Sequence, residues 1–376
     1  MVYLDNAATT YPKPPSVISK SSFAMINYGA NPGRSGHILS MKTGEAVFAA
    51  RQRCAEFFGS EVENVCFVLN CTQAINTVLK GFLTHNVHVI VSDIEHNAVM
   101  RPLNSLVKTI GISYSIAETD DDDDITVRNF EKLINQKTRL IICTAASNVT
   151  GKILPYKKIG DLCKKRGICF TLDAAQGGGI LPITLSDNIN FICAAGHKGL
   201  YGPMGTGLLV TDGRYKLKTL IEGGTGSASM DINQPEFLPD RFESGTINTS
   251  GAIALGAGVT FVADKGIETV YEHEWSLCKF AFDNLDKNPK VLLYQKEYTK
   301  KSVPLFCFNL SGLSSDEASK NLSDNGFFLR GGFHCAPAAH KKMGTLEKGA
   351  VRFAPSVFTT KSEVASFIRA VYKITQ

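Results

Sequence analysis

Long apolar runs are missing from the sequence, and so is a strong charge of either sign. No stretch is apolar enough over a sufficient length to cross a bilayer, which argues against a membrane protein. The net charge is only +5 over 376 residues, so neither nucleic acid nor a membrane surface is expected as a partner. The residues from Met1 to Asp5 lack a basic segment followed by an apolar core. We therefore expect no signal peptide and a cytoplasmic location.

Patterns typical of metal sites and disulfide frameworks are missing as well. The ten cysteines form no CxxC pair, so neither a zinc site nor a redox dithiol is expected. Without a secretion signal, reduced thiols are the expected state. Cys66, Cys143, Cys169 and Cys193 lie in or beside apolar runs, which predicts that they are buried. The five aspartates at 120–124 are interpreted as a solvated surface loop rather than a metal site.

The sequence does contain a regular alternation of short apolar runs and helix-like stretches. Strands are predicted at 65–69, 87–91, 140–143, 169–172 and 191–193, with helices at 72–83 and 156–166. Continuous apolar strands between helices favour an α/β fold with a mostly parallel sheet covered on both faces. From about residue 255 a long helical pattern, a strand at 303–309 and a terminal helix predict a smaller α+β domain.

Two polar residues follow neighbouring predicted strands, where the site of such a sheet is expected. Lys198 ends the segment Ala195-Gly196-His197-Lys198, and a lysine amine of lowered pKa can form a Schiff base with an aldehyde cofactor. Asp173 is placed to keep the pyridine nitrogen of pyridoxal phosphate (PLP) protonated, and Gln176 to donate to its phenolate oxygen. Taken alone, a surface lysine and a helix-capping aspartate are the alternatives.

Two further segments suit the same cofactor. Asn70-Cys71-Thr72 begins a helix directly after a strand, so free N–H groups and the helix dipole favour a phosphate there. The alternative is an N-capping threonine. His96 follows the strand at 87–91 and has the shape to stack on a cofactor ring and move protons. The alternative is a structural histidine.

One cysteine stands apart from the other nine. Cys335 lies in the Gly-rich loop Arg330-Gly331-Gly332-Phe333-His334-Cys335, where positive neighbours favour the reactive thiolate. Arg352 is a candidate clamp for a substrate carboxylate, the alternative being a surface ion pair. The Gly-rich turn at 202–207 lacks the spacing of a dinucleotide-binding loop.

In combination these motifs resemble the class V aminotransferase group of PLP enzymes with the type I fold, and within it the cysteine desulfurase/selenocysteine lyase family. The resemblance runs from Tyr3-Leu4-Asp5-Asn6 to Arg352 and is most specific at Asp173-x-x-Gln176, His197-Lys198 and Arg330-x-x-x-His334-Cys335. It implies domains at 13–254 (PLP-binding) and at 1–12 with 255–376 (carrying the cysteine loop). It also implies a homodimer and the removal of sulfur or selenium from cysteine-like substrates.

The resemblance implies a role for each matching residue. Catalysis falls to Lys198 as Schiff-base lysine, Cys335 as persulfide carrier and His96 on the ring. The remaining cofactor contacts are Cys71, Thr72, Asn148, Asp173, Gln176 and His197, with Thr246 reaching the other subunit's phosphate. Asn148, Arg330 and Arg352 are the implied substrate contacts. An acceptor protein would collect the sulfur, as in iron–sulfur cluster assembly.

The sequence departs from the family pattern at Ala195, where a phosphate-binding serine or threonine is usual, and at Cys71, where glycine or serine is common. The short segment between Cys335 and Arg352 resembles the group with Suf-type desulfurases and selenocysteine lyases. Two alternatives stay open. One is an ordinary class V aminotransferase or other PLP lyase in which Cys335 is incidental. The other is a non-catalytic scaffold that binds a sulfur carrier.

Overall fold

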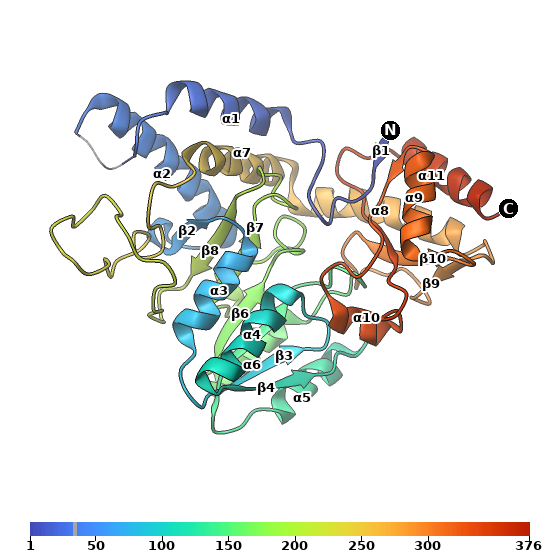
Figure 1. Ribbon diagram of the computed structural model, residues 1–376, viewed down its shortest axis with the longest axis horizontal. Helices are drawn as coiled ribbons and strands as arrows, with labels where there is room; N and C mark the ends of the chain where they lie inside the picture. Colours follow the sequence, from blue (N-terminus) through green and yellow to red (C-terminus); the bar gives the residue numbers. More distant parts are fainter. Residues whose placement is uncertain (33–35) are drawn as a thin grey trace.

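The computed structural model describes residues 1–32 and 36–376. A large sheet lies at the centre of its bigger part (Figure 1). Its strands are β2 (Val65–Val68), β3 (His88–Ser92), β4 (Ser113–Ala117), β5 (Thr138–Thr144), β6 (Cys169–Asp173), β7 (Phe191–Ala195) and β8 (Gly207–Thr211). The order is β2-β8-β7-β6-β5-β3-β4, and only β8 runs antiparallel to its neighbours. This mostly parallel sheet confirms the predicted fold class.

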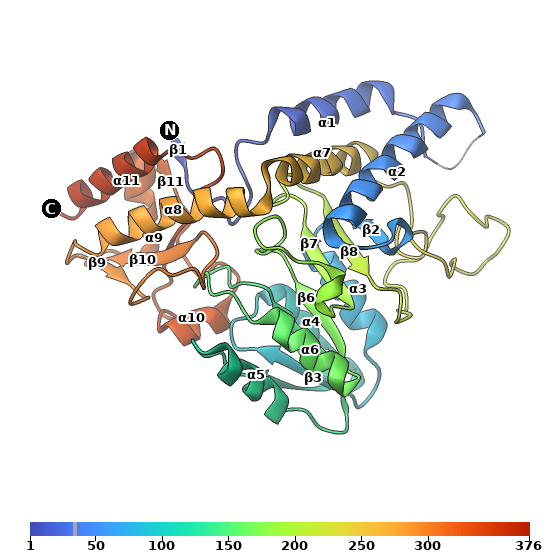
Figure 2. The same ribbon diagram turned by 180° about the vertical axis from the view of Figure 1, so that it is seen from behind.

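Helices cover both faces of the large sheet. They are α1 (Pro15–Asn27), α2 (Ile38–Phe58), α3 (Cys71–Phe82), α4 (Asn97–Ile110), α5 (Asp123–Lys132), α6 (Tyr156–Arg166) and α7 (Thr249–Lys265), with short 3₁₀ turns at Val62–Asn64 and Leu185–Asp187. On β5, Leu140 and Ile142 pack with α3 and α4 side chains, whereas Ile141 and Cys143 pack with those of α2 and α6. The two sets of helices appear from opposite sides in Figures 1 and 2. Burial of both faces explains the continuous apolar strands.

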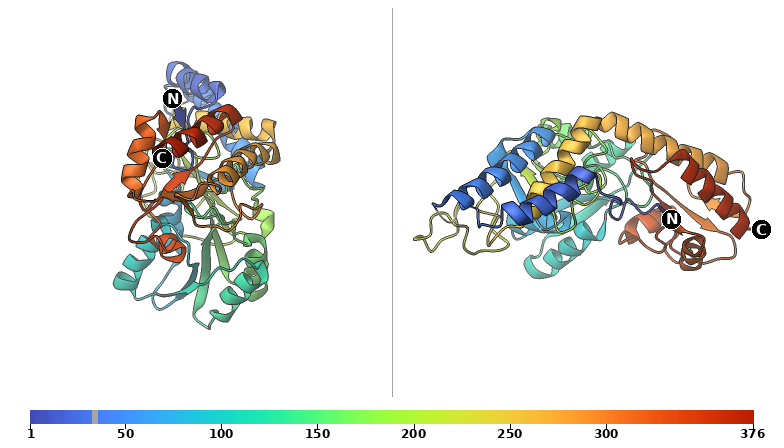
Figure 3. Two further views of the ribbon diagram at one scale, coloured as in Figure 1. Left: turned by 90° about the vertical axis from the view of Figure 1, so that its right-hand side faces the viewer. Right: turned by 90° about the horizontal axis from the view of Figure 1, so that it is seen from above.

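The C-terminal elements form a second, smaller body. They are α8 (Ile267–Leu285), β9 (Val291–Leu293), β10 (Phe306–Leu310), α9 (Ser315–Asp324), β11 (Phe327–Phe328), α10 (Pro337–Met343), β12 (Val351–Phe353) and α11 (Lys361–Ile374). Strands β12, β10 and β9 form an antiparallel sheet, with its own apolar core. β1 (Val2–Tyr3) pairs with β11, so the N-terminus lies beside these late elements (Figure 3). In the described part of the chain, no helix is long and apolar enough to cross a membrane.

Strand direction decides where functional side chains meet. β2 and β7 both run antiparallel to β8, so they share one direction, and β3, β5 and β6 run parallel to β7. The carboxyl ends of these five strands therefore open on one edge of the sheet, where ligands bind in open α/β sheets.

Candidate active site

A cavity of about 210 Å³ lies at this carboxyl edge. One water takes about 30 Å³ in the liquid, so the cavity can hold several waters or a small ligand in their place. Its lining residues follow β2, β3, β5, β6 and β7. The structure thus brings together most of the residues singled out in the sequence, which are Cys71, Thr72, His96, Asn148, Asp173, Gln176, His197 and Lys198.

Asp173 is the last residue of β6 and is 2% exposed. Its Oδ1 accepts a hydrogen bond from Ala175 N at 2.9 Å and contacts the Cys71 Sγ at 3.4 Å. Burial, followed by the charge of Asp173, raises the pKa of the Cys71 thiol well above its ordinary value. Cys71 is therefore a neutral thiol, and its single hydrogen is shared between this carboxylate and Cys193 O, which lies 3.2 Å from the Sγ. The sequence did not reveal these contacts.

Lys198 follows β7 in a tight turn. Burial lowers the pKa of its amine, and the nearby charge of Arg352 adds to this shift. The preceding carbonyl, His197 O, accepts hydrogen bonds from Thr10 N at 3.0 Å, Thr9 Oγ1 at 3.1 Å and Lys13 Nζ at 2.8 Å. The N-terminal segment therefore holds the lysine turn, and sequence reasoning missed these contacts because they join residues far apart in the chain.

His96 caps the start of α4. Its Nδ1 accepts a hydrogen bond from Ala98 N at 3.0 Å, so the neutral ring carries its hydrogen on Nε2. Burial lowers the pKa of this imidazole. The preceding Glu95 is fully buried, which raises the pKa of its carboxyl to about 8. The cavity wall therefore carries a neutral His96, and the buried Glu95 precedes it in the chain.

The N-terminus of α3 forms the end of the cavity suited to an anion. Asn70, not Thr72, caps this helix by accepting from Gln73 N at 2.9 Å, and the first N–H groups of a helix have no intrahelical acceptor. Nearby, His197 Nδ1 is buried without a hydrogen-bond partner among the described residues. Ala195 lines the same cavity without a hydroxyl. These donors fit a phosphate group.

Cys335 is the exposed cysteine, whereas the other nine are buried, as predicted. The Arg330 Nη2 lies 4.0 Å from its Sγ. The loop rests on the cavity wall because Asn148 Nδ2 donates to His334 O at 2.7 Å and Asn97 N donates to Cys335 O at 2.8 Å. The structure therefore places the thiol loop directly beside the strand-end residues.

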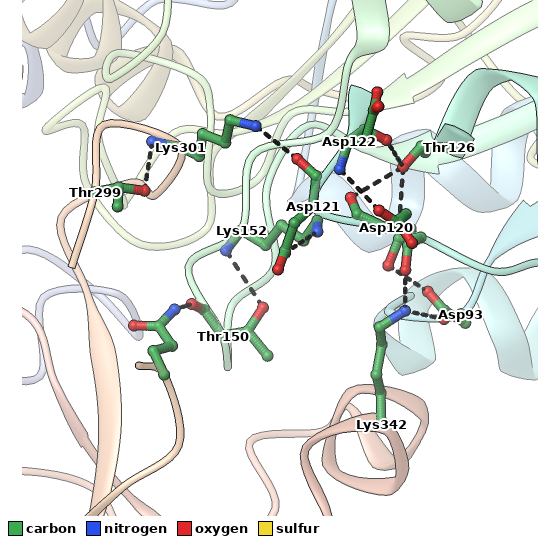
Figure 4. A network of polar contacts seen from close by, with 12 residues as sticks. Asp93, Asp120, Asp121, Asp122, Thr126, Thr150, Lys152, Thr299, Lys301 and Lys342 are labelled. Carbon is green, nitrogen blue, oxygen red and sulfur yellow. Dashed lines mark hydrogen bonds and ion pairs between the residues drawn. The ribbon is translucent and has the colours of Figure 1, made fainter. Parts of the chain in front are cut away.

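The helix after this loop, α10, is anchored to the large-sheet side (Figure 4). Lys342 Nζ pairs with Asp93 Oδ2 at 2.5 Å and donates to Thr119 O. The nearby aspartate run lies on the surface as expected, where Asp121 pairs with Lys152 at 2.9 Å and Asp122 caps α5. The described residues hold no cluster of three or more His, Cys, Asp or Glu arranged for a metal.

Arg352 is 1% exposed and lies on β12. Its Nη2 pairs with Asp5 Oδ1 at 2.7 Å and its Nη1 donates to Asn148 O at 3.0 Å, while Nε is buried with no partner among the described residues. Arg352 is thus a buried, paired arginine and not a surface one. Thr246 lies away from the cavity of its own chain, exposed and within 3.4 Å of Asn31 Nδ2.

Comparison with known proteins gives the family. Residues 2–367 match the family model described as Aminotransferase class-V. The chain belongs to the aminotransferase class-V family. A probable cysteine desulfurase from Mycolicibacterium paratuberculosis is 30% identical over 100% of this chain, which spans only 56% of that relative. A probable cysteine desulfurase from Synechocystis sp. is 27% identical, with 99% of this chain and 90% of the relative covered.

A solved structure agrees with this assignment. The apo structure of cysteine desulfurase from Thermococcus onnurineus NA1 matches with a TM-score of 0.93 at 28% identity, covering 100% of this chain and 94% of that chain. The resemblance noted in the sequence is therefore confirmed. Membership of the class-V family implies a PLP-dependent enzyme in general. The cavity fits that group, because a carboxylate, a lysine amine of lowered pKa and an anion-binding helix end all open into it.

Proposed function

We propose that this protein is a PLP-dependent cysteine desulfurase that removes sulfur, or selenium, from cysteine or selenocysteine. The observation that carries the proposal is the exposed Cys335, whose loop is hydrogen-bonded to Asn148 and Asn97 at the wall of a cavity holding Asp173 and Lys198. A reactive thiol beside a PLP cavity is what sulfur removal requires. The names of the similar proteins support the same activity.

The cofactor contacts belong to this proposal. PLP, when bound, supplies an electron sink that stabilises a carbanion at the substrate's α-carbon. Lys198 would hold it as a Schiff base, and Asp173 would keep its ring nitrogen protonated. His96 would cover the ring, and Asn148 and Gln176 would contact the phenolate oxygen. The N–H groups of Cys71 and Thr72, the Thr72 hydroxyl and His197 would hold the phosphate.

The chain's own groups then move the protons and the sulfur. The lowered pKa of Lys198 makes a neutral amine available, which takes the α-proton of the substrate. The Cys335 thiolate attacks the substrate sulfur and forms an S–S bond. The electron pair of the broken C–S bond stays with the amino-acid carbon, which is protonated and leaves as alanine. The Cys335 persulfide passes its outer sulfur to an acceptor thiol by exchange.

Two arginines serve the substrate carboxylate. Arg352 is held by Asp5 and by Asn148 O, and its buried Nε still lacks a partner among the described residues. A carboxylate beside it would receive a charge-assisted hydrogen bond. Arg330 is exposed, and its Nη2 lies 4.0 Å from the Cys335 Sγ, so it would meet the substrate beside the attacking thiol.

We also propose a homodimer in which Thr246 contacts the phosphate in the partner's cavity. Large apolar side chains are exposed on α1, on α2 and on the segment between β8 and α7. They support an interface, since exposed apolar patches mark contact surfaces. They include Phe23, Met25, Ile26, Met41, Phe48, Met230 and Ile232.

Residues 13–254 would form the PLP domain, and residues 1–12 with 255–376 the small domain, a grouping supported by the β1–β11 pairing. A cytoplasmic location and an acceptor in iron–sulfur assembly complete the proposal.

The decisive experiment measures alanine and sulfide released from L-cysteine in the presence of a thiol reductant. Cys335→Ala should keep the Schiff-base absorbance band and lose alanine formation, with selenocysteine turnover falling less because selenium leaves more readily. The matched control is Cys163→Ala, which removes a buried thiol of α6. Normal cysteine turnover by Cys335→Ala would favour an ordinary aminotransferase or lyase. A protein that binds no PLP would instead point to a scaffold.

A further inference from the structure

Two buried histidines, one in the Cys335 loop and one on the helix after it, have no part in the proposed reaction. His334 is 1% exposed and His340, on α10, is 0% exposed. Their ring planes are parallel within 8°, with centroids 5.5 Å apart. Two imidazoles removed from water in this way must satisfy their nitrogens through the protein.

Their hydrogen bonds form one continuous chain. His334 Nε2 lies 3.1 Å from Arg330 O, His334 Nδ1 lies 3.3 Å from His340 Nε2, and His340 Nδ1 lies 2.8 Å from the Thr345 hydroxyl. A carbonyl only accepts, so His334 carries its hydrogen on Nε2. In its neutral form it then accepts at Nδ1 from His340 Nε2–H, and His340 Nδ1 accepts from Thr345. A single pair of tautomers thus satisfies every nitrogen.

Both rings are neutral in the pH range where the enzyme would work. Burial lowers the pKa of His334 to about 2, with the charge of Arg352 as the next cause. Burial alone lowers the pKa of His340 to about 4. Arg330 also faces His334, while the Phe333 ring lies edge-on against His340. The chain of neutral hydrogen bonds is therefore stable against protonation.

The Cys335 loop, which these hydrogen bonds support, has an unusual backbone. His334 and Cys335 both have positive φ, 49° and 56°, a conformation that residues other than glycine adopt rarely. Such residues persist only where their surroundings hold them. Asn148 and Asn97 hold the two carbonyls from the cavity side. The His334 ring adds a further anchor through Arg330 O and His340, beside the backbone bonds from Arg352 N to Arg330 O and from Ala350 N to Gly332 O.

We infer that His334, His340 and Thr345 form a positioning relay that fixes Cys335 and Arg330 relative to each other at the cavity. The inference rests on the proposed function, because it assigns these residues to the delivery of the desulfurase thiol. The relay touches neither substrate nor cofactor. It acts by holding the strained turn in which Arg330 Nη2 approaches the Cys335 Sγ.

Graded substitutions test the relay. His340→Leu keeps the apolar bulk and removes both hydrogen bonds, whereas His340→Gln keeps an amide N–H in the place of Nε2–H. We expect His340→Leu to lower kcat for alanine formation by about 10- to 100-fold, since small misplacements of a reacting group cost that much. The KM for cysteine and the Schiff-base absorbance should stay near wild-type values. His340→Gln should recover most of the rate, and Thr345→Val should cause a smaller loss.

The matched control is His88→Leu. His88 is also buried and bonded to a threonine hydroxyl, Thr138 Oγ1 at 2.9 Å, but it begins β3 at the sheet edge opposite the cavity. It should lose stability without losing kcat. Wild-type kcat in folded His340→Leu overturns the inference, and so does an equal loss of kcat in His88→Leu. Should His340→Leu fail to fold, His340→Gln and Thr345→Val give the same comparison.

A second readout does not depend on activity. In ¹⁵N-histidine-labelled protein, His334 and His340 should show the neutral tautomer protonated at Nε2 and should not titrate between about pH 5 and 8, where an ordinary histidine does. Their signals are assigned by their change in His340→Gln. A ring that titrates in this range, or one protonated at Nδ1, contradicts the relay. If the wild-type protein shows these tautomers yet makes no alanine, the relay stands and the proposed function fails.

Discussion

Asp173 and Lys198 are held at the ends of strands in a large sheet, whereas Cys335 lies in a loop held by single backbone and side-chain contacts. Asp173 ends β6, and Lys198 follows β7 in a turn where His197 O accepts four hydrogen bonds from the N-terminal segment. Both strands are fully buried and paired on either side. The Cys335 loop has a single isolated bridge, between Arg330 and Arg352, three residues of positive φ and a few polar anchors.

This difference indicates where each part of the site is vulnerable. The large sheet fixes the positions of Asp173 and Lys198, so replacing either residue should lower activity without moving its neighbours. The thiol side depends on single contacts, such as the Lys342–Asp93 pair beneath α10 (Figure 4). A substitution there should move the thiol while leaving the cofactor bound.

The largest effect is expected for Lys198→Ala. This change removes both the cofactor bond and the amine that takes the α-proton, so alanine formation should fall more than about 10⁴-fold, the scale seen when a covalent catalytic group is deleted. Borohydride should no longer fix PLP to the chain. Lys320→Ala on α9, where the amine pairs only with exposed Asp324, serves as control and should behave like wild type.

Asp173→Asn should have the next largest effect. The amide keeps the size of the carboxylate and can still accept from Ala175 N, so the fold and the Cys335 loop should be unchanged. Without the negative charge the ring nitrogen of PLP is no longer held protonated, and kcat should fall roughly 10²- to 10⁴-fold. Steady-state kinetics and absorbance spectra check this. A variant with wild-type kcat would remove Asp173 from the proposed mechanism.

Arg352→Gln is expected to affect both binding and stability. Losing the guanidinium should raise the KM for cysteine about 10-fold, equivalent to one charge-assisted contact of about 1.4 kcal/mol. Because Asp5 is left without its partner, the free energy of unfolding should fall by about 3–5 kcal/mol. Denaturant titration of Arg352→Gln, Asp5→Asn and the double variant tests the coupling. Strictly additive losses would show that the pair contributes nothing.

The smallest expected effect is the pH dependence of the free energy of unfolding that arises from His340. His340 has a folded-state pKa of about 4 against an ordinary value of 6.5, so the unfolded chain binds the proton first as pH falls. Its contribution to stability is therefore complete above about pH 6.5 and declines towards pH 4, by up to about 1.4 kcal/mol per pH unit. The difference in unfolding free energy between wild type and His340→Gln should shrink over that window. A constant difference would mean that folding does not change the pKa of His340.

Much of the large sheet was predictable because its strands are apolar and its helices are bounded by clear signals. The helix at Tyr156–Arg166 was predicted to the residue. Strand β4 was missed because it is a half-exposed edge strand with two serines, and β8 because a Gly-rich turn precedes it. The strand predicted at 303–309 was wrong at its start, since Val303 N bonds Gly151 O and β10 begins only at Phe306.

The candidate site was predictable where chemistry follows a strand, as at Asp173 and Lys198. Contacts between distant segments were not. Nothing near His340 in the sequence indicates that its ring meets His334, and nothing near Asp5 marks it as the partner of Arg352. The first pair depends on the turn that leads into α10, and the second on the N-terminal segment joining the C-terminal elements, and no local pattern encodes either.

The pairing of β1 with β11 has a consequence for biosynthesis. Val2 and Tyr3 leave the ribosome more than three hundred residues before their partners Phe327 and Phe328. Contacts of such long sequence separation form slowly, because closing the loop costs entropy before any contact stabilises it. The segment that grips the lysine turn at Thr9, Thr10 and Lys13 follows directly after β1. A PLP-competent pocket is therefore expected to mature only after synthesis has passed Phe328.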